Sequence, residues 1–299
     1  MRKIIGIGET VLDIIFGSDN QPQQANPGGS VFNSLISLGR SNVPCLFISE
    51  VGDDKIGDII CNFLIDNGVD NEYMYHHKGS KSPLALAFLD SNKNAQYSFY
   101  KDYKSQELTI KHPEINPGDI VLFGSFFALN PIIRSSVKEF LSHAKSCGAL
   151  LYYDVNFRAT HKHEICDLMP TLIENFTLAD IVKGSDEDFE IMFSTNDWRE
   201  AYHKHIEPHC KTFICTQGAK GATIIVGKEE RHVEGNKITP ISTVGAGDSF
   251  NAGTAYGIYK YGIQKEDVLF VDSMVPAMSH GIDFATEVCQ SLENYIAKR

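Results

Sequence analysis

The sequence has no long hydrophobic run, no excess of basic residues and no closely spaced pair of cysteines. No apolar stretch approaches the roughly 20 residues that a membrane-spanning helix needs. The formal net charge is −11, whereas a general nucleic-acid-binding protein carries a basic surface. The seven cysteines are scattered and never form C-x-x-C, which is typical of reduced thiols in the cytoplasm. We therefore expect a cytoplasmic protein that binds neither a membrane nor a nucleic acid, although a small anionic ligand is not excluded.

Two common nucleotide-binding signatures are also missing. Gly6 and Gly8 begin a dinucleotide pattern, G-x-G-x-x-G, but Val11 stands where its last glycine belongs. No stretch follows the phosphate-loop pattern G-x-x-x-x-G-K-[ST]. These absences disfavour a nicotinamide-dependent dehydrogenase and a Walker-type nucleotide site.

Short apolar runs alternate with helical patterns along most of the chain. Residues 4–7 and 149–153 are typical of buried strands, and the spacing predicts a helix over 30–38 that ends at Gly39. A second helix is predicted from Ile56 onward, with Asn67-Gly68 as its C-terminal stop. Fully apolar strands between helices indicate a mostly parallel sheet with helices on both faces. No linker or repeat divides the chain, so residues 1–299 are expected to form one domain.

Two stretches interrupt this alternation. Residues 13–27 are polar and rich in Gln and Asn, and residues 82–103 alternate like an exposed β-hairpin. Strands that leave a parallel sheet early are suited to cover a ligand at its edge. We predict that these two segments form a small β lid.

The segment Gly245-Ala246-Gly247-Asp248 carries the strongest chemical signal. Two glycines around one alanine let backbone amides at a helix start approach an anion closely. Phosphoryl transfer to an alcohol needs such amides for the phosphoryl group and a carboxylate that accepts the hydroxyl proton. The alternative is an ordinary helix N-terminus with Asp248 in its first turn.

Residues 243–250 resemble the C-terminal signature of the ribokinase-like (PfkB) sugar kinases, whose Asp at the position of Asp248 is the catalytic base. Residues 27–39 are similar to the N-terminal signature of that family, with Gly28, Gly29 and Asn33 at the matching positions. The glycines permit close approach of a polyol, and Asn33 offers a donor and an acceptor to hydroxyl groups. The resemblance implies a three-layer α/β/α ribokinase-like fold with a mostly parallel central sheet and a small β lid.

Two further segments match the family in order, and both bear on the sugar. Asp13 resembles the residue that holds sugar hydroxyls after the first strand. Arg158 lies in a D-x-N-x-R segment similar to that of fructokinases and ketodeoxygluconate kinases, where the arginine meets substrate or phosphate. The alternatives are a solvated loop residue for Asp13 and a structural ion pair with Asp154 for Arg158.

Residues 216–222 resemble the nucleotide turn T-x-G-x-x-G of the family, which assigns Thr216, Gly218 and Gly221 to the cofactor ATP. Its alternative is an ordinary hairpin turn between two strands. Where relatives carry N-x-x-E, which helps to organise Mg²⁺, this chain has Ser185 and Asp188. Asp188, with Glu187 beside it, is the candidate metal site, and a helix cap with an acidic first turn is the alternative.

The resemblance as a whole predicts an ATP-dependent phosphotransferase acting on a terminal hydroxyl of a sugar, with fructose as the expected substrate and Mg²⁺ as the cofactor metal. Alternatives are 2-keto-3-deoxygluconate or another sugar or nucleoside as substrate, and a non-catalytic sensor on the same fold. The intact Asp248 argues against a sensor. Many relatives have Asp where this chain has Ser242, which leaves dependence on a monovalent cation open. The resemblance also implies lid residues such as Phe88 or Phe99 over the sugar and a homodimer formed through the lid.

Overall fold

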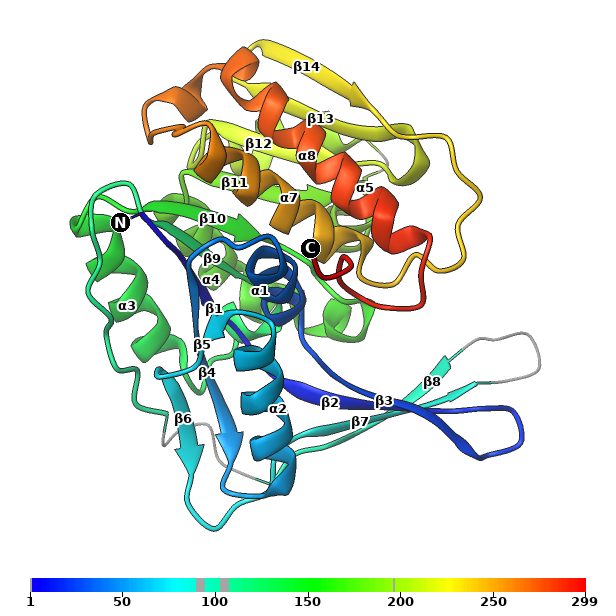
Figure 1. Cartoon of the computed structure of the whole chain (residues 1–299). Coiled ribbons are helices and arrows are strands. Elements are labelled where there is room, and N and C mark those ends of the chain that lie inside the picture. The colour runs from blue at the N-terminus through cyan, green and yellow to red at the C-terminus, as the bar shows by residue number, and fades with distance from the viewer. Residues whose placement is uncertain (1, 90–94, 103–107, 196) are drawn as a thin grey trace.

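A central, mostly parallel sheet organises the chain (Figure 1). The computed structural model describes residues 2–89, 95–102, 108–195 and 197–299. The strand order is β14-β13-β12-β11-β10-β9-β1-β4-β5, and β6 also pairs with β4. The strands are β1 (Ile4–Ile7), β4 (Cys45–Gly52), β5 (Val69–Asp70), β6 (Met74–His77), β9 (Ile120–Gly124), β10 (Leu150–Asp154), β11 (Ile181–Ser185), β12 (Thr212–Thr216), β13 (Gly221–Val226) and β14 (Glu229–Glu234).

All neighbouring strands from β12 to β5 pair in parallel, and β13 runs antiparallel to both of its neighbours. The chain moves outward in one direction from β1 to β4 and in the other from β9 to β14. Ligands of open parallel sheets bind beyond the carboxyl ends of the strands at such a point of reversal. The topology therefore places a ligand site beside the ends of β1 and β9.

Helices cover both faces of this sheet, because successive strand residues point to opposite sides. Ile4 and Leu150 belong to one buried cluster, and their neighbours Ile5 and Leu151 belong to the other. The first face is covered by α1 (Ser30–Arg40), α2 (Lys55–Asp66), α7 (Ala246–Lys260) and α8 (Val271–Cys289). The second is covered by α3 (Arg134–Ser146), α4 (Ile165–Leu178), α5 (Asp186–Phe193) and α6 (Trp198–Ala201). Shorter helical turns are η2 (Phe126–Ala128), η3 (Ala159–Glu164), η4 (Tyr202–Ile206), η5 (Gly218–Lys220) and η6 (Asp267–Leu269).

This arrangement confirms the predicted three-layer fold, with one difference at the end of α1. The expectation that Gly39 ends the helix is wrong, because α1 continues to Arg40. A Cβ at position 39 would lie 2.1 Å from the carbonyl oxygen of Asn67, so this glycine serves close packing against the turn after α2. The predicted stop of α2 is confirmed, since the helix ends at Asp66 with Asn67 as its C-cap. Within the described ranges, no helix is both long enough and apolar enough to cross a bilayer.

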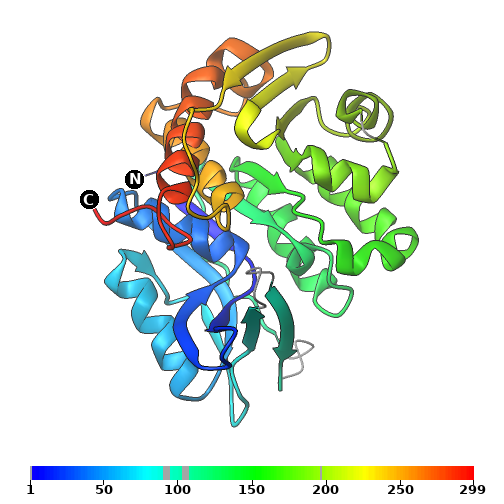
Figure 2. The ribbon, with the colours of Figure 1, turned by 90° about the vertical axis from the view of Figure 1, so that its right-hand side faces the viewer.

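Both predicted lid segments enter a second sheet, which we call the lid sheet, in the order β3-β2-β7-β8. Its strands are β2 (Val11–Phe16), β3 (Pro22–Gly28), β7 (Leu84–Leu89) and β8 (Ala95–Tyr100). The predicted hairpin is confirmed by the antiparallel pairing of β7 with β8, while residues 90–94 and 103 lie outside the described residues. The lid sheet extends away from the body in Figure 1, and in Figure 2, where the view is turned by 90°, it faces the viewer.

The two faces of the lid sheet differ in character. Asp13 pairs with Ala85, and Ala85 pairs with Phe99, so these three share one face. Phe88 stacks on Phe16 with ring centroids 4.8 Å apart and therefore lies on the opposite face. The expectation that Phe88 covers the same ligand as Asp13 is wrong, because its strand position has the other parity. Phe99 lies on the same face as Asp13, as covering the same ligand requires.

Candidate active site

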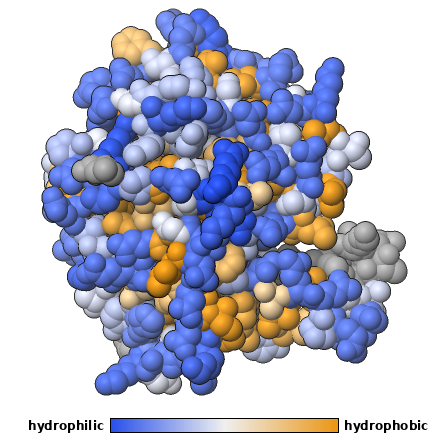
Figure 3. All heavy atoms as spheres, viewed as in Figure 1, coloured by the Kyte–Doolittle hydropathy of each residue, from blue (hydrophilic) through white to orange (hydrophobic). Residues whose placement is uncertain are grey.

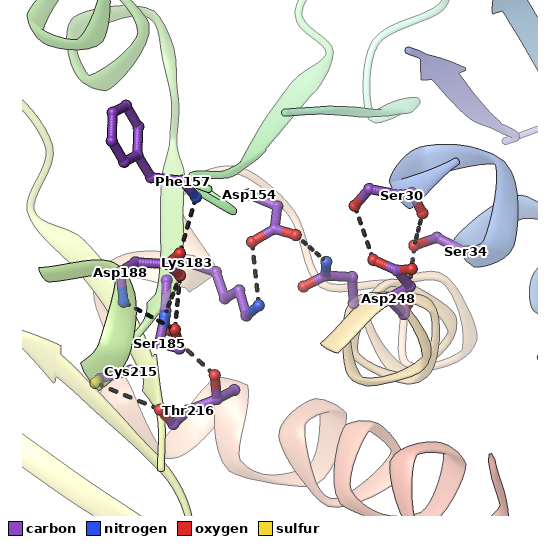
Figure 4. Close-up of polar contacts among 12 residues, drawn as sticks. Ser30, Ser34, Asp154, Phe157, Lys183, Ser185, Asp188, Cys215, Thr216 and Asp248 are labelled. Atoms are coloured by element: carbon purple, nitrogen blue, oxygen red, sulfur yellow. Dashed lines mark hydrogen bonds and ion pairs between the residues drawn. The ribbon is translucent and has the colours of Figure 1, made fainter. Parts of the chain in front are cut away.

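Asp248 is held at the start of α7 by two donors from α1. Ser30 Oγ donates to Asp248 Oδ1 at 2.8 Å, and Asn33 Nδ2 donates to Asp248 Oδ2 at 2.8 Å. Ser34 Oγ donates to the backbone carbonyl of Asp248 at 2.8 Å, which ties the helix itself to α1 (Figure 4). Burial raises the pKa of Asp248, and the bonds from Asn33 and Ser30 oppose part of that rise. The result is a carboxylate with a fixed orientation and an increased tendency to take up a proton.

Backbone amides lie beside this carboxylate, but the expected contribution of the Ala246 amide is wrong, because that amide is used within the turn. Gly245 has φ 80°, a left-handed conformation that glycine adopts without strain, and it forms the N-cap of α7. The amide of Ala246 donates to the carbonyl of Thr243. Among the described residues, the amides of Gly247 and Asp248 have no hydrogen-bond partner. Unpaired amides at a helix start favour an anion.

Asp13, Gly28, Gly29 and Asn33 converge on the other side of Asp248. A Cβ at Gly28 would lie 2.5 Å from Asp13 Oδ2 and 3.9 Å from Asn33 Oδ1, so only glycine leaves this space open. Gly29 has φ 134° and passes close to the carbonyl of Glu9. Asn33 Oδ1 is buried without a hydrogen-bond partner among the described residues, and the same part of the chain offers no partner for the Asp13 carboxylate. These acceptor oxygens surround space that a donor such as a hydroxyl group would fill.

The Asp13 carboxylate is poorly solvated, and burial raises its pKa to about 6. The expectation of a solvated loop residue is wrong, because Asp13 lies within β2 and is mostly covered. Asn33 has only its Oδ1 atom available, since its amide nitrogen is bound to Asp248. Sequence analysis expected Asn33 to offer both a donor and an acceptor to the sugar. In the structure its donor binds the Asp248 carboxylate, and its acceptor Oδ1 faces the open space.

Arg158 and Glu9 lie at the same edge of the sheet, and sequence analysis assigned no role to Glu9. Burial raises the pKa of Glu9, while a hydrogen bond from Ser125 and the positive charge of Arg158 oppose the rise. Ser125 has φ 56°, which is uncommon for a residue with a side chain, and such strain concentrates at functional sites. The alternative of an ion pair between Arg158 and Asp154 is wrong, because the Asp154 carboxylate is bound to other groups. Arg158 is exposed and remains available to a ligand.

The Asp154 carboxylate instead binds Lys183 and Asn251. Lys183 Nζ lies 3.1 Å from Asp154 Oδ1, and Asn251 Nδ2 donates to Asp154 Oδ2 at 2.7 Å. Sequence analysis assigned no role to Lys183 or Asn251. A lysine that follows Ile181 and Val182 in a buried strand was the available signal.

The predicted nucleotide turn connects β12 to β13. Thr216 is the last residue of β12, and Gly218 has φ 55° with open space around it. Gly221 has φ 102°, and a Cβ there would lie 2.1 Å from the carbonyl oxygen of Val233. Gly221 is thus required by the pairing with β14, as the hairpin interpretation holds, whereas Gly218 is accessible to a ligand.

The candidate metal residues differ in their surroundings. Asp188 Oδ2 accepts from the amide and the hydroxyl of Ser185 at 2.7 and 2.8 Å, and Asp188 Oδ1 accepts from the amide of Phe157 at 2.8 Å. This contact set includes the predicted capping box of α5. Glu187 is exposed. Among residues 2–89, 95–102, 108–195 and 197–299, no group of three or more His, Cys, Asp and Glu side chains is arranged to hold a metal ion.

A hollow of about 380 Å³ borders the nucleotide turn, lined in part by Gln217, Lys220 and Thr223. Two more of its lining residues, Arg199 and Glu230, pair with each other, and the hollow contains no residue of the Asp248 cluster. It is therefore not the place where Asp248 acts.

Comparison with known proteins agrees with this geometry. The model of the pfkB family carbohydrate kinases matches residues 1–270. The chain belongs to this family. It is an ATP-dependent sugar kinase, as both the family and its fructokinase homologues indicate. The prediction of a ribokinase-like kinase is thereby confirmed.

Several relatives in this family are described as fructokinases. The probable fructokinase-3 of Arabidopsis thaliana is 27% identical over 259 residues, which cover 83% of this chain and 75% of the relative. The fructokinase of Vibrio alginolyticus is 24% identical over 255 residues, or 85% of this chain and 83% of the relative.

Solved structures show the same fold. The fructokinase double mutant of Vibrio cholerae O395, bound to fructose, ADP and potassium ion, has a TM-score of 0.84 at 22% identity and covers 98% of this chain and 94% of its own. The aminoimidazole riboside kinase of Salmonella enterica, complexed with aminoimidazole riboside and an ATP analogue, has a TM-score of 0.79 at 22% identity. The match covers 98% of this chain and 95% of that kinase.

Proposed function

We propose that this sugar kinase transfers the γ-phosphate of ATP to a terminal hydroxyl of fructose, with residues 1–299 acting as one kinase domain. The observation that carries the proposal is the position of Asp248. Its carboxylate is oriented by Ser30 and Asn33, and the unpaired amides of Gly247 and Asp248 lie beside it. A base and an anion socket at one helix start match the two demands of phosphoryl transfer to an alcohol.

In the proposed reaction, Asp248 accepts the proton of the sugar hydroxyl as the hydroxyl oxygen bonds to the γ-phosphorus. The bond from that phosphorus to the β-phosphate oxygen breaks, and ADP leaves. The unpaired amides of Gly247 and Asp248, in the turn that begins at Gly245, stabilise the charge on the transferring group. Thr216 and Gly218 contact the remaining phosphates, and Gly221 supports their turn. Closure of the lid sheet would exclude water and limit hydrolysis of ATP.

The substrate class follows from the acceptors that surround the sugar space. Asp13, Asn33 Oδ1 and Glu9 offer acceptors to hydroxyl groups, and the positive charge of Arg158 acts on both Glu9 and Asp248. This mainly acidic set favours a neutral polyol over 2-keto-3-deoxygluconate, whose carboxylate it would repel. Fructose supplies the neutral polyol, and the fructokinase relatives support that choice. A riboside is the second candidate, because the Salmonella neighbour is described with one.

Mg²⁺ would be held mainly by the phosphates of ATP, as this ion commonly keeps several waters in kinase sites. Three of the roughly four acceptor positions of Asp188 are used by Ser185 and Phe157, which leaves room for a contact through water. We therefore propose that Asp188 contacts Mg²⁺ through a water molecule. Glu187, which is exposed, would lie farther from the ion. Bound Mg²⁺ would neutralise part of the negative charge of the phosphates.

Dependence on a monovalent cation is a separate question, because this chain has the hydroxyl of Ser242 where many relatives have a carboxylate. Comparing the activity in KCl with that in NaCl measures whether such a cation contributes.

The outer face of the lid sheet suits contact with a second copy of the chain. Ile14, Phe16, Leu86 and Phe88 share this face, opposite to Asp13, and all are only partly buried. Figure 3 shows hydrophobic side chains on the lower part of the molecule, near the base of the lid sheet. We propose a homodimer through this face. Light scattering should give the mass of a dimer, and Ile14→Asp should give a monomer.

The decisive test of the function measures ADP release with Mg·ATP and a panel of fructose, ribose, 2-keto-3-deoxygluconate, tagatose, adenosine and fructose 6-phosphate. Fructose should give the highest kcat/KM. Asp248→Asn should lower kcat by at least about 10²-fold, the usual size of a general base contribution. Asp272→Asn, at an exposed surface carboxylate, is the control and should be unaffected. Activity of Asp248→Asn at the wild-type level would contradict the assigned base.

A further inference from the structure

The side chain of Lys183 is a buried charge that the site described so far leaves without a chemical role. It lies at the carboxyl end of β11 and is 4% exposed. An ammonium group has three N–H donors, and among the described residues Lys183 Nζ makes one hydrogen bond, to Asp154 Oδ1 at 3.1 Å. A buried charge is costly unless it is paired and hydrogen-bonded, so the two unused donors call for an acceptor.

The unused donors lie next to the amide socket. A Cβ at Gly247 would lie 3.6 Å from Lys183 Nζ, so the ammonium stands at van der Waals distance from the first turn of α7. The unpaired amides of Gly247 and Asp248 belong to that same turn. Figure 4 shows the Lys183 side chain reaching from β11 toward Asp154, between Asp188 and the start of α7. The amides and the ammonium thus border the same space.

The ammonium is held in place and kept charged by its surroundings. Burial alone would lower the pKa of Lys183, but Asp154, Asp188 and Asp248 together raise it above its ordinary value. Asp154 is fixed in turn by Asn251 Nδ2 at 2.7 Å, and Asn251 Oδ1 accepts from Tyr152 at 3.2 Å. Asp154 therefore joins β10, β11 and α7, and it presents Lys183 as a permanent positive charge.

We propose that Lys183 binds the γ-phosphate of ATP directly and stabilises the charge on the transferring phosphoryl group. This inference rests on the proposed phosphoryl transfer. The new bond joins the sugar oxygen to the γ-phosphorus, the bond to the β-phosphate oxygen breaks, and Asp248 takes the hydroxyl proton, while Lys183 keeps its own protons. Asp154 and Asn251 are positioning residues for the ammonium. A compact point charge suits the equatorial oxygens of such a group.

Lys183→Met tests this role through the γ-phosphate alone. The variant should lose about tenfold or more in affinity for a non-hydrolysable ATP analogue by calorimetry, the size expected for a lost charged hydrogen bond, and change little in affinity for ADP. Its kcat should fall by about 10²-fold or more, as for other transition-state donors, with KM for the sugar nearly constant. Lys3→Met is the matched control, since Lys3 pairs with the buried Asp119 at 3.1 Å near the amino end of β1.

A purely structural ion pair gives a different result in the double variant Lys183→Met/Asp154→Asn. This variant removes both charges and leaves no buried carboxylate without a partner, so it should fold with a melting temperature near that of the wild type. We expect it to remain as slow as Lys183→Met. Recovery of kcat in the double variant, or equal loss of ADP and ATP-analogue affinity in Lys183→Met, would overturn the inference. If the wild type phosphorylates no sugar, the proposed function fails, and the comparison of ADP with the ATP analogue still tests Lys183.

Discussion

Replacement of Asp13 by asparagine should stabilise the free protein at neutral pH and weaken its binding of sugar. Asp13 is mostly buried, and its carboxylate has no hydrogen-bond partner in the part of the chain that the structure describes. Ionisation of Asp13 therefore lowers the free energy of unfolding at neutral pH. Buried groups that gain a hydrogen-bond partner only when substrate binds commonly lower the stability of the free protein.

The pKa of this group sets the magnitude. Burial raises the pKa of Asp13 from 3.8 to about 6. At about 1.4 kcal/mol per unit, a rise of about two units corresponds to about 3 kcal/mol at neutral pH. Some of this is recovered by solvent that reaches the side chain, so we expect Asp13→Asn to increase the free energy of unfolding by about 2 kcal/mol. For a chain of this size, that raises the melting temperature by about 4 °C.

The effect has a definite dependence on pH. The unfolded chain releases the Asp13 proton near pH 3.8, whereas the folded protein holds it until about pH 6. The contribution of Asp13 to stability is therefore complete below pH 3.8 and is lost as the pH rises through about 6. The asparagine does not titrate, so the difference between variant and wild type should be near zero at pH 4 and complete at pH 7.

Thermal unfolding between pH 4 and 7.5 measures this difference, with and without fructose. Asp19→Asn is the matched control, because Asp19 lies at the exposed turn between β2 and β3. Fructose should raise the melting temperature of the wild type and of Asp19→Asn, and raise that of Asp13→Asn much less. A difference that does not vary with pH, or an Asp13→Asn protein less stable than wild type at pH 7, would refute the reasoning.

Three more substitutions test separate parts of the site. Ser30→Ala removes a donor that opposes the raised pKa of Asp248, so the acidic limb of kcat/KM should move to higher pH; an unchanged pH profile would contradict this. Gly221→Ala should lower the melting temperature by several degrees, because its Cβ would meet the carbonyl of Val233 at a left-handed φ; a melting temperature equal to wild type would count against the packing argument. Gly247→Ala has room for its methyl group and should melt at or above the wild-type temperature, since alanine favours a helix by about 1 kcal/mol, yet lose kcat by tenfold or more because the methyl group occupies the phosphate space; full activity would contradict the socket.

The parts of the site that could be predicted are those whose residues are close in sequence. Gly245 to Asp248 form one helix start, whose local pattern indicated anion binding. Gly28 to Asn33 form one turn and helix, for which the family resemblance indicated polyol binding. The alternation of apolar runs indicated the parallel sheet for the same reason. Local patterns determine such elements before any tertiary contact is considered.

The remaining parts depend on contacts between distant segments. Ser30 and Asp248 are 218 positions apart, and no local pattern shows that one donates to the other. Lys183 and Asn251 are brought together by their contacts with Asp154 on a third element. Residues 13–27 were assigned to the lid, but the bounds of β2 and β3 within them were not predicted, because their exposed edge and polar face give weak alternation. These strands form because β2 pairs with β7, a contact that their own sequence does not indicate.

The distribution of charge explains how an acid can stand at an anion socket. The two oxygens of Asp248 are turned toward Ser30 and Asn33 of α1, while the unpaired amides and Lys183 lie on the other side. At an effective dielectric constant near 20, two unit charges 4 Å apart interact by about 4 kcal/mol. A carboxylate alone would therefore repel a γ-phosphate at that distance by an energy of this order. The ammonium opposes this repulsion from within the fold, before any metal arrives with the nucleotide. In the proposed reaction the sugar hydroxyl would enter between the two, so that the carboxylate accepts its proton and the phosphoryl group faces the positive charge.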